Sequence, residues 1–330
     1  GSELFSAMLT NPFGCVVFTL LFLVICFLIN RGGISGGIEK FTKYAMPALF
    51  VMLLVVIIRS VTLPGAGEGL RFMLVPNLQP LKEDFMAVIS SAGGQMFFSL
   101  SLGMGAMITY GSYLDKKEDL QKNAIIIPAC DTLIAVMAGM AVLPACAAYD
   151  VPYASGPGLL FTSMQQVFTN MGEFGSFVGF MFYFLVFIAA VTSSISLLEV
   201  VCTYRIDASI DKGKKPNRQK ITCIAAGLIF VVGLPVALDA LGSGGAAFPA
   251  PYEIINYQVA EGAKIPMAID CWLDFFDMLS EGVLMPFGAL AMSVLIGWVY
   301  KTKNAVVPEC EQSGHKFWGY GFFNVCFKFV

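Results

Sequence analysis

The sequence predicts an all-α membrane protein that crosses the bilayer several times. Of its 330 residues, 57% are hydrophobic and only 13% are charged, and the mean hydropathy is +0.75. Such values exclude an ordinary soluble domain and make the lipid bilayer a partner of the chain. Two patterns agree with this: apolar segments of spanning length recur along the chain, and basic residues gather in alternate loops.

The composition also excludes several classes of function. The net charge of −3 argues against a nucleic-acid partner. His315 is the only histidine, and the nine cysteines lie mostly within apolar runs without a Cys-x-x-Cys pair. We therefore expect no disulfide framework, no metal cluster of His and Cys, no organic cofactor and no enzymatic activity.

Seven apolar segments are long enough to be transmembrane helices. They lie near residues 12–29, 44–62, 88–113, 124–147, 175–204, 221–241 and 275–300. An eighth begins near Phe317 and extends to Val330, which is enough for only about three helical turns.

The basic residues distinguish the two sides of the membrane. Fifteen of them follow the first, third, fifth and seventh segments: Arg31, Lys40, Lys43, Lys116, Lys117, Lys122, Arg205, Lys212, Lys214, Lys215, Arg218, Lys220, Lys301, Lys303 and Lys316. The loops of the other side carry Arg59, Arg71, Lys82 and Lys264. By the positive-inside rule the larger set is cytoplasmic, so the chain begins outside.

The outer connections predicted by this orientation are long. Residues 63–87 and 242–269 are rich in Gly, Pro and Asn, which favour irregular loops. Residues 146–171 contain a Gly-Pro-Gly turn at 156–158. They fit either a short helix–turn–helix that dips toward a central cavity or an exposed loop.

The third segment is apolar enough to span the bilayer, but its centre is poor helix-forming sequence. Two glycines and two serines fall within residues 99–105; glycine costs about 1 kcal/mol against alanine inside a helix, and serine hydroxyls compete for backbone groups. A break at membrane depth is stable only where it is buried in protein or lines a wet cavity, and there it can bind ions. The alternative is a continuous helix whose small residues pack against a neighbour.

Polar side chains inside other segments are further candidates. Asp131 lies about two turns into the fourth segment, where it can bind a cation or a proton, or else sits near enough to the interface to stay hydrated. The fifth segment carries Thr192, Ser193, Ser194 and Ser196, with Thr192 and Ser196 on one helical face. These hydroxyls suit Na+ or a close helix–helix interface. Glu199 fits a buried acid or a cytoplasmic anchor equally well.

Two further features lie at segment ends. Gly37 and Pro47 are ten residues apart at the cytoplasmic start of the second segment, where they either loosen the helix or merely begin it. Asp274 and Asp277 open the seventh segment at its outer end, where acids are ordinary partners of a helix dipole.

Together these features resemble the neurotransmitter:sodium symporter family, especially its bacterial amino-acid members. The matching strings are GQMFFSLSLGMGAMITYGSY at 94–113 and AAVTSSI at 189–195, supported by the Gly37–Pro47 spacing and by FDMLS at 276–280. The resemblance implies a LeuT-type fold of two inverted repeats, of which the chain matches family helices 4–10 and the start of helix 11. Residues 1–62 would end the first repeat, 88–300 would form the second, and 317–330 would begin a further helix. We therefore expect a chain without the family's first three helices.

The resemblance also implies roles for individual residues. The third segment would be unwound from Phe98 to Met104. The substrate-binding residues would be Phe98, Ser99, Ser101, Met104, Ser193 and Leu197. One sodium site would use Ser99 and Asp131, and the other would use the Ala189 carbonyl, Thr192 and Ser193. The gating residues would be Gln95, Asp277, Gly37 and Pro47.

The function implied is a fragment of a Na+-coupled amino-acid symporter in a bacterial inner membrane. An acid at Asp131 would supply the negative charge that chloride provides in animal members, so we expect chloride independence. The visible pocket side chains suggest an apolar or aromatic amino acid. Because both sodium sites would lack ligands, we expect the chain alone to be unable to transport. A seven-helix receptor is the alternative, and the sequence leaves the oligomeric state open.

Overall fold

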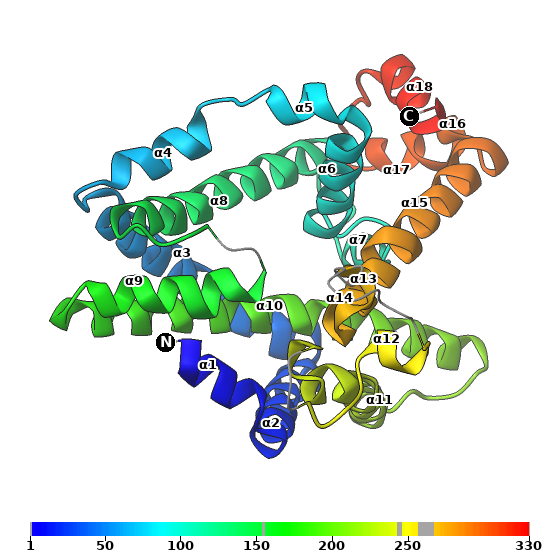
Figure 1. Cartoon of the computed structure of the whole chain (residues 1–330). Coiled ribbons are helices and arrows are strands. Elements are labelled where there is room, and N and C mark those ends of the chain that lie inside the picture. Colours follow the sequence, from blue (N-terminus) through cyan, green and yellow to red (C-terminus); the bar gives the residue numbers. More distant parts are fainter. Residues whose placement is uncertain (1, 154–155, 243–245, 257–266, 330) are drawn as a thin grey trace. The chain divides into compact units, whose positions relative to one another are not determined.

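A computed structural model describes residues 2–153, 156–242, 246–256 and 267–329, which form helices and connecting turns without a β-strand (Figure 1). The chain divides into two compact units, one of residues 1–77 and 135–275 and one of residues 78–134 and 276–330. This is a division in space, and the boundaries of the two sequence repeats remain a prediction.

The first unit contains most of the long helices. Its elements are α1 (Ser2–Leu9), α2 (Pro12–Asn30), η1 (Ile34–Ile38), α3 (Glu39–Val61), α4 (Ala66–Leu74), the end of α8 (Leu120–Ala148), η2 (Leu159–Ser163), α9 (Met164–Asn170), α10 (Glu173–Asp211), α11 (Arg218–Leu238), η3 (Ala240–Gly242), α12 (Pro251–Ile254), α13 (Met267–Asp270) and most of α14 (Trp272–Asp277).

The second unit is smaller and its helices are shorter. Its elements are α5 (Gln79–Glu83), α6 (Phe85–Ser99), α7 (Ala106–Gly111), the start of α8, the end of α14, η4 (Met278–Leu284), α15 (Met285–Val294), η5 (Leu295–Val299), α16 (Thr302–Ala305), α17 (Val307–Glu311) and α18 (Tyr320–Phe329). The helix expected at 317–330 is therefore present as α18.

Six helical stretches of the described residues are long and apolar enough to cross a membrane. They are Pro12–Asn30, Ile34–Val61, Leu120–Ala148, Glu173–Asp211, Arg218–Gly242 and Trp272–Val299. They match six of the seven predicted segments. The predicted segment 88–113 is absent from the set because α6 ends at Ser99 and α7 begins at Ala106. The alternative of a continuous helix in this segment is therefore wrong.

Several helices extend beyond the predicted apolar segments. The second span begins at Ile34, as the π-helical turn η1, rather than near residue 44. The fifth predicted segment continues as helix α10 to Asp211 rather than ending near residue 204. Polar residues at these ends are acceptable helix formers, so a hydropathy pattern does not mark them.

Helix α10 organises the first unit, since it packs against α2, α3, α9 and α11. Its buried apolar residues recur at helical spacing and form one stripe. They include Val191, Ile195, Leu198 and Cys202, which pack with Cys26 of α2 and Ala225 of α11. The hydroxyl run of α10 begins on the same helical turns as this stripe, so the packing of α10 fixes where those hydroxyls lie.

The long outer connections contain helices where the sequence predicted loops. Residues 63–87 include α4 and α5, and α4 approaches α8 so closely that a Cβ on Gly69 would lie 2.4 Å from the carbonyl oxygen of Leu143. Residues 242–269 include α12 and most of α13, while 243–245 and 257–266 lie outside the described residues. Glycine and proline fix the ends of these short helices rather than preventing them.

The alternative of an exposed loop at 146–171 is also wrong. Residues 159–170 form η2 and α9, and Met164, Val167 and Phe168 are buried in the core of the first unit. Their i, i+3, i+4 spacing gives α9 one apolar face that packs against α10.

A buried acid ties the end of α11 to the start of α14. Asp239 is fully buried and accepts hydrogen bonds from the backbone N–H groups of Leu241 (3.1 Å) and Trp272. Cys271, next to this junction, is also buried, and burial raises the pKa of its thiol to about 11. The junction therefore holds a neutral thiol and a carboxyl with one hydrogen bond to each oxygen, between the spans Arg218–Gly242 and Trp272–Val299.

Candidate functional site

The break predicted in the third apolar segment is present, but it is shifted along the chain. Residues 100–105 connect α6 to α7, and Ser101, Gly103 and Gly105 adopt positive φ angles of 54°, 76° and 83°. Phe98 and Ser99, predicted to be unwound, still belong to the last turn of α6. The glycines explain the position of the break because only glycine adopts left-handed backbone at little cost.

Two residues that the resemblance implied as sodium ligands meet beside the break. The hydroxyl of Ser99 donates a hydrogen bond of 2.7 Å to the carboxylate of Asp131. Asp131 lies about three turns inside α8, on the part of that helix that belongs to the same unit as α6. The pair offers a formal negative charge and a rotatable hydroxyl at the end of an interrupted helix.

The second group of oxygen atoms lies on α10. The hydroxyl of Thr192 donates to the carbonyl oxygen of Ala189 at 2.8 Å, and the hydroxyl of Ser196 donates to the carbonyl oxygen of Thr192 at 3.0 Å. Ser193 and Leu197 are exposed one turn apart. The structure thus places two of the three predicted ligands of the second sodium site within one hydrogen bond.

The predicted substrate-binding residues fall into both units. Phe98, Ser101 and Met104 belong to the second, and Ser193 and Leu197 to the first. Phe98 is 51% exposed and Leu197 is 48% exposed. That these residues form a common pocket remains a prediction.

The predicted gating residues occupy helical positions. Gln95 is exposed on α6, and Asp277 ends α14. Gly37 lies in η1, where a Cβ would be 2.0 Å from the carbonyl oxygen of Ile29. Pro47 lies inside α3; the alternative of a proline in the first helical turn is therefore wrong. An interior proline leaves one carbonyl without its helical partner.

Glu281 is an acid that the sequence analysis overlooked. It follows Asp277 by four residues, in η4. The signal was available: two acids at i and i+4 within an apolar helix lie on one face.

Of the two alternatives for Glu199, the structure shows the buried acid. Its side chain is fully buried and forms an ion pair with Arg218 of α11. Arg218 also donates to the carbonyl oxygen of Asn30 at 3.0 Å, and the Asn30 amide donates to the carbonyl oxygen of Ile195 at 2.8 Å. These contacts join α2, α10 and α11, and sequence spacing alone gave no sign of them.

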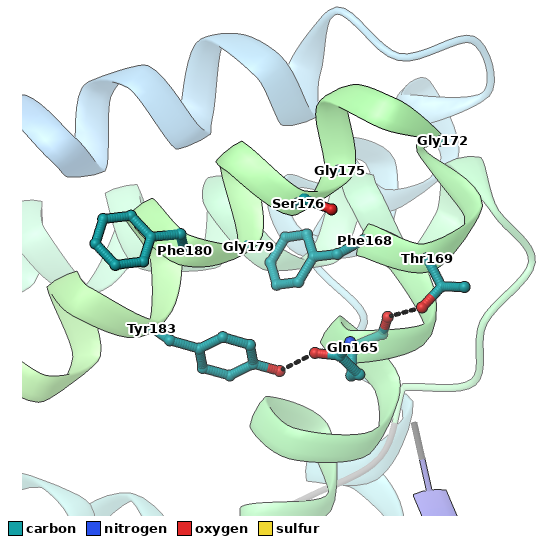
Figure 2. Close-up of a pocket in the computed structure, with 9 residues that line it drawn as sticks. All are labelled: Gln165, Phe168, Thr169, Gly172, Gly175, Ser176, Gly179, Phe180 and Tyr183. Carbon is teal, nitrogen blue, oxygen red and sulfur yellow. Dashed lines mark hydrogen bonds between the residues drawn. The ribbon is translucent and has the colours of Figure 1, made fainter. Parts of the chain in front are cut away.

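A cavity of about 380 Å³ opens between α9 and the start of α10, and none of the residues that line it is a predicted site residue (Figure 2). Phe168, Phe180 and Tyr183 supply its rings, and the Tyr183 hydroxyl donates to the Gln165 side-chain oxygen at 3.2 Å. Glycines on α10 make room for this packing, since a Cβ on Gly179 would lie 3.1 Å from the Phe168 ring.

The fold and the broken helix define a class. A polytopic α-helical protein with an interrupted helix, whose last turn before the break contacts a carboxylate, has the arrangement of a secondary transporter. The model of the sodium:neurotransmitter symporter family matches residues 9–250. The chain belongs to the sodium:neurotransmitter symporter family.

Individual relatives agree with this assignment. The chain is 34% identical to an uncharacterized sodium-dependent transporter of Haemophilus influenzae over 292 residues, which cover 88% of the chain and 58% of that protein. It is 28% identical to the human sodium- and chloride-dependent GABA transporter 2 over 308 residues, 91% of the chain and 46% of that protein. The chain thus spans about half the length of these relatives.

A solved structure shows the same fold. The crystal structure of MhsT in complex with L-phenylalanine superposes with a TM-score of 0.80 at 31% identity, covering 99% of this chain and 67% of that one. The predicted all-α, LeuT-type fold is confirmed. Membership in a family of sodium-dependent membrane transporters also sets aside the seven-helix receptor.

Proposed function

We propose that this chain carries sodium-binding groups of a Na+-coupled amino-acid symporter that works by alternating access. The observation that carries the proposal is the hydrogen bond between Ser99, at the broken helix, and Asp131. Hard cations prefer oxygen ligands, and rotation of the serine hydroxyl turns its lone pairs toward an ion held by the carboxylate. Backbone carbonyls freed by the break are the ligands that such helices add.

The Asp131 carboxylate also supports chloride independence. It places a fixed negative charge beside the ion, so the site needs no diffusible anion for charge balance. The chain differs in this proposed property from its animal relatives that are named as sodium- and chloride-dependent.

A second ion would bind on α10. The hydrogen bond from Thr192 to the carbonyl oxygen of Ala189 already holds two oxygen atoms close together, and Ser193 is the third candidate ligand. In the proposed cycle this ion leaves toward the cytoplasm when the helix between Gly37 and Pro47 unwinds.

The proposed substrate is an apolar or aromatic amino acid. Phe98, Met104 and Leu197 are the apolar side chains among the predicted binding residues, and the similar MhsT structure contains L-phenylalanine. The bacterial relatives support a place in the bacterial plasma membrane.

Binding is the first test. The 330-residue chain in nanodiscs is assayed with a panel of tritiated aromatic and aliphatic amino acids in Na+ and in K+, together with the thermal stabilisation that Na+ produces. We expect a Na+-specific stabilisation that is weak, because both sites lack ligands in this chain, and that is reduced further in Ser99→Ala and in Thr192→Ala. Matched controls are the neighbouring hydroxyls, Thr132→Ala and Ser194→Ala, which should behave like the wild type. Equal responses to Na+ and K+ would remove the sodium assignments.

Transport is a separate prediction. We expect no Na+-driven uptake into proteoliposomes from the chain alone, and uptake from a chimera that adds the first three helices of the Bacillus subtilis relative. Uptake by the 330 residues alone would show that those helices are dispensable.

A further inference from the structure

The unwound segment of the broken helix meets the backbone of α15 at one point. A Cβ built on Gly103 would lie 2.1 Å from the carbonyl oxygen of Met285, and a Cβ built on Gly288 would lie 2.4 Å from the carbonyl oxygen of Gly103. Met285 and Gly288 are three residues apart on α15, so they share one face of that helix. The contact is made by backbone on both sides.

The two glycines are present for different reasons. Gly103 has a φ of 76°, so its own conformation favours glycine. Gly288 lies inside α15, where glycine costs about 1 kcal/mol relative to alanine. What requires the missing side chain at Gly288 is therefore the Gly103 carbonyl beside it.

This contact supports a segment that has few bonds of its own. Between α6 and α7 the backbone leaves the helical pattern, and the Leu102 N–H donates instead to the Phe97 carbonyl oxygen at 2.9 Å. The position of such a segment depends on the surface on which it rests. Ser99, which hydrogen-bonds Asp131, lies only four residues before Gly103.

We propose that Gly288 is a positioning residue that seats the unwound segment against α15 and thereby holds Ser99 beside Asp131. The expected effect on Na+ binding rests on the proposed function. The seating of the unwound segment against α15 does not. With alanine at Gly288, the segment must shift by roughly 1 Å before the new Cβ and the Gly103 carbonyl oxygen are at ordinary contact distance. Displacing a partner that orients a metal ligand typically weakens metal binding by roughly 10- to 100-fold.

The test is Gly288→Ala in the full chain in nanodiscs, followed by hydrogen–deuterium exchange and by Na+ titration of thermal stability. We expect exchange across residues 97–106 to become roughly tenfold faster, with other peptides unchanged. The half-saturating Na+ concentration should rise by roughly tenfold or more.

Two glycines provide matched controls. A Cβ on Gly94 of α6 meets no atom within 4 Å, and the nearest atom to a Cβ on Gly282 lies 3.9 Å away. Gly94→Ala and Gly282→Ala should keep both wild-type values, because neither adds an atom to the contact.

The outcomes separate the two proposals. Unchanged exchange across 97–106 in Gly288→Ala overturns the seating. If the wild type shows no Na+ response, the proposed function fails, while the exchange data still decide the seating. If Gly288→Ala does not fold, exchange in the wild type decides: slow exchange at 102–104 supports the seating, and exchange at the rate of an open chain contradicts it.

Discussion

Two side chains that are 32 residues apart meet at the proposed ion site. Ser99 and Asp131 each stood out in the sequence for a local reason, one for a poor helix centre and the other for a charge in an apolar run. Their hydrogen bond of 2.7 Å is a product of the fold. A serine hydroxyl beside a carboxylate can exchange its hydrogen bond for a shared cation without moving the backbone.

Asp131→Asn tests the role of this charge. Asparagine keeps the shape and one oxygen atom but removes the negative charge, so we expect the half-saturating Na+ concentration to rise by about tenfold or more. The response should then depend on chloride, which the wild type should not require. The measurement is Na+-dependent thermal stabilisation in chloride and in gluconate; a chloride-insensitive variant contradicts the proposed charge balance.

The buried pair of Glu199 and Arg218 should matter for stability rather than for ion binding. Arg218→Met leaves a fully buried carboxylate without its counter-ion, and removing one partner of a buried pair costs about 3–5 kcal/mol. We expect a clearly lower melting temperature for Arg218→Met and partial recovery in the Glu199→Gln/Arg218→Met double variant, since the neutral amide needs no counter-ion. The control is Arg205→Met, because Arg205 is an exposed arginine on α10, the helix that carries Glu199.

At the scale of elements, the turn that begins the second span depends on one glycine of an adjacent pair. A Cβ on Gly37 would lie 2.0 Å from the carbonyl oxygen of Ile29, whereas a Cβ on Gly36 meets nothing within 4 Å. The π-helical turn η1 can therefore fold back onto α2 only with glycine at Gly37.

The adjacent pair gives a direct comparison. We expect Gly37→Ala to lower the free energy of unfolding by about 1–3 kcal/mol through overpacking. Gly36→Ala should be neutral or slightly stabilising because alanine favours helix. Thermal unfolding of both variants in the same detergent is sufficient, and equal melting temperatures would show that η1 does not pack on α2 as described.

At the scale of the whole molecule, orientation is the main open prediction. Fifteen basic residues follow the first, third, fifth and seventh predicted segments, and four lie in the other loops. We expect an epitope inserted after Lys214 to be protected in intact cells and one inserted after Gly67 to be accessible. The Gly67 position is open, since a Cβ there meets nothing within 4 Å. The opposite labelling pattern would reverse the predicted topology.

Length and hydropathy were sufficient to predict an all-α membrane protein and the six spans. Glycine placement marked the third segment as a candidate for a break, and the resemblance to the symporter family implied the break itself and the LeuT-type fold. The signals from hydropathy and glycine are local: a spanning helix needs a continuous apolar run, and left-handed backbone needs glycine within the run itself. Asp131 and the hydroxyls of the fifth segment stood out for a local reason too, as oxygen-bearing side chains in segments where polar groups are costly. Their assignment to two sodium sites, with Ser99 and the Ala189 carbonyl, came from the family resemblance.

Only the tertiary structure decided which of these residues meet. It placed Ser99 against Asp131, paired Glu199 with Arg218, and brought Gly103 onto the backbone beside Gly288. It also showed packed helices such as α4 where loops were predicted, and it decided for helix over exposed loop at α9. Each of these contacts joins residues distant in the chain, and their partners are chosen by packing across helices rather than by the spacing of residues along one of them.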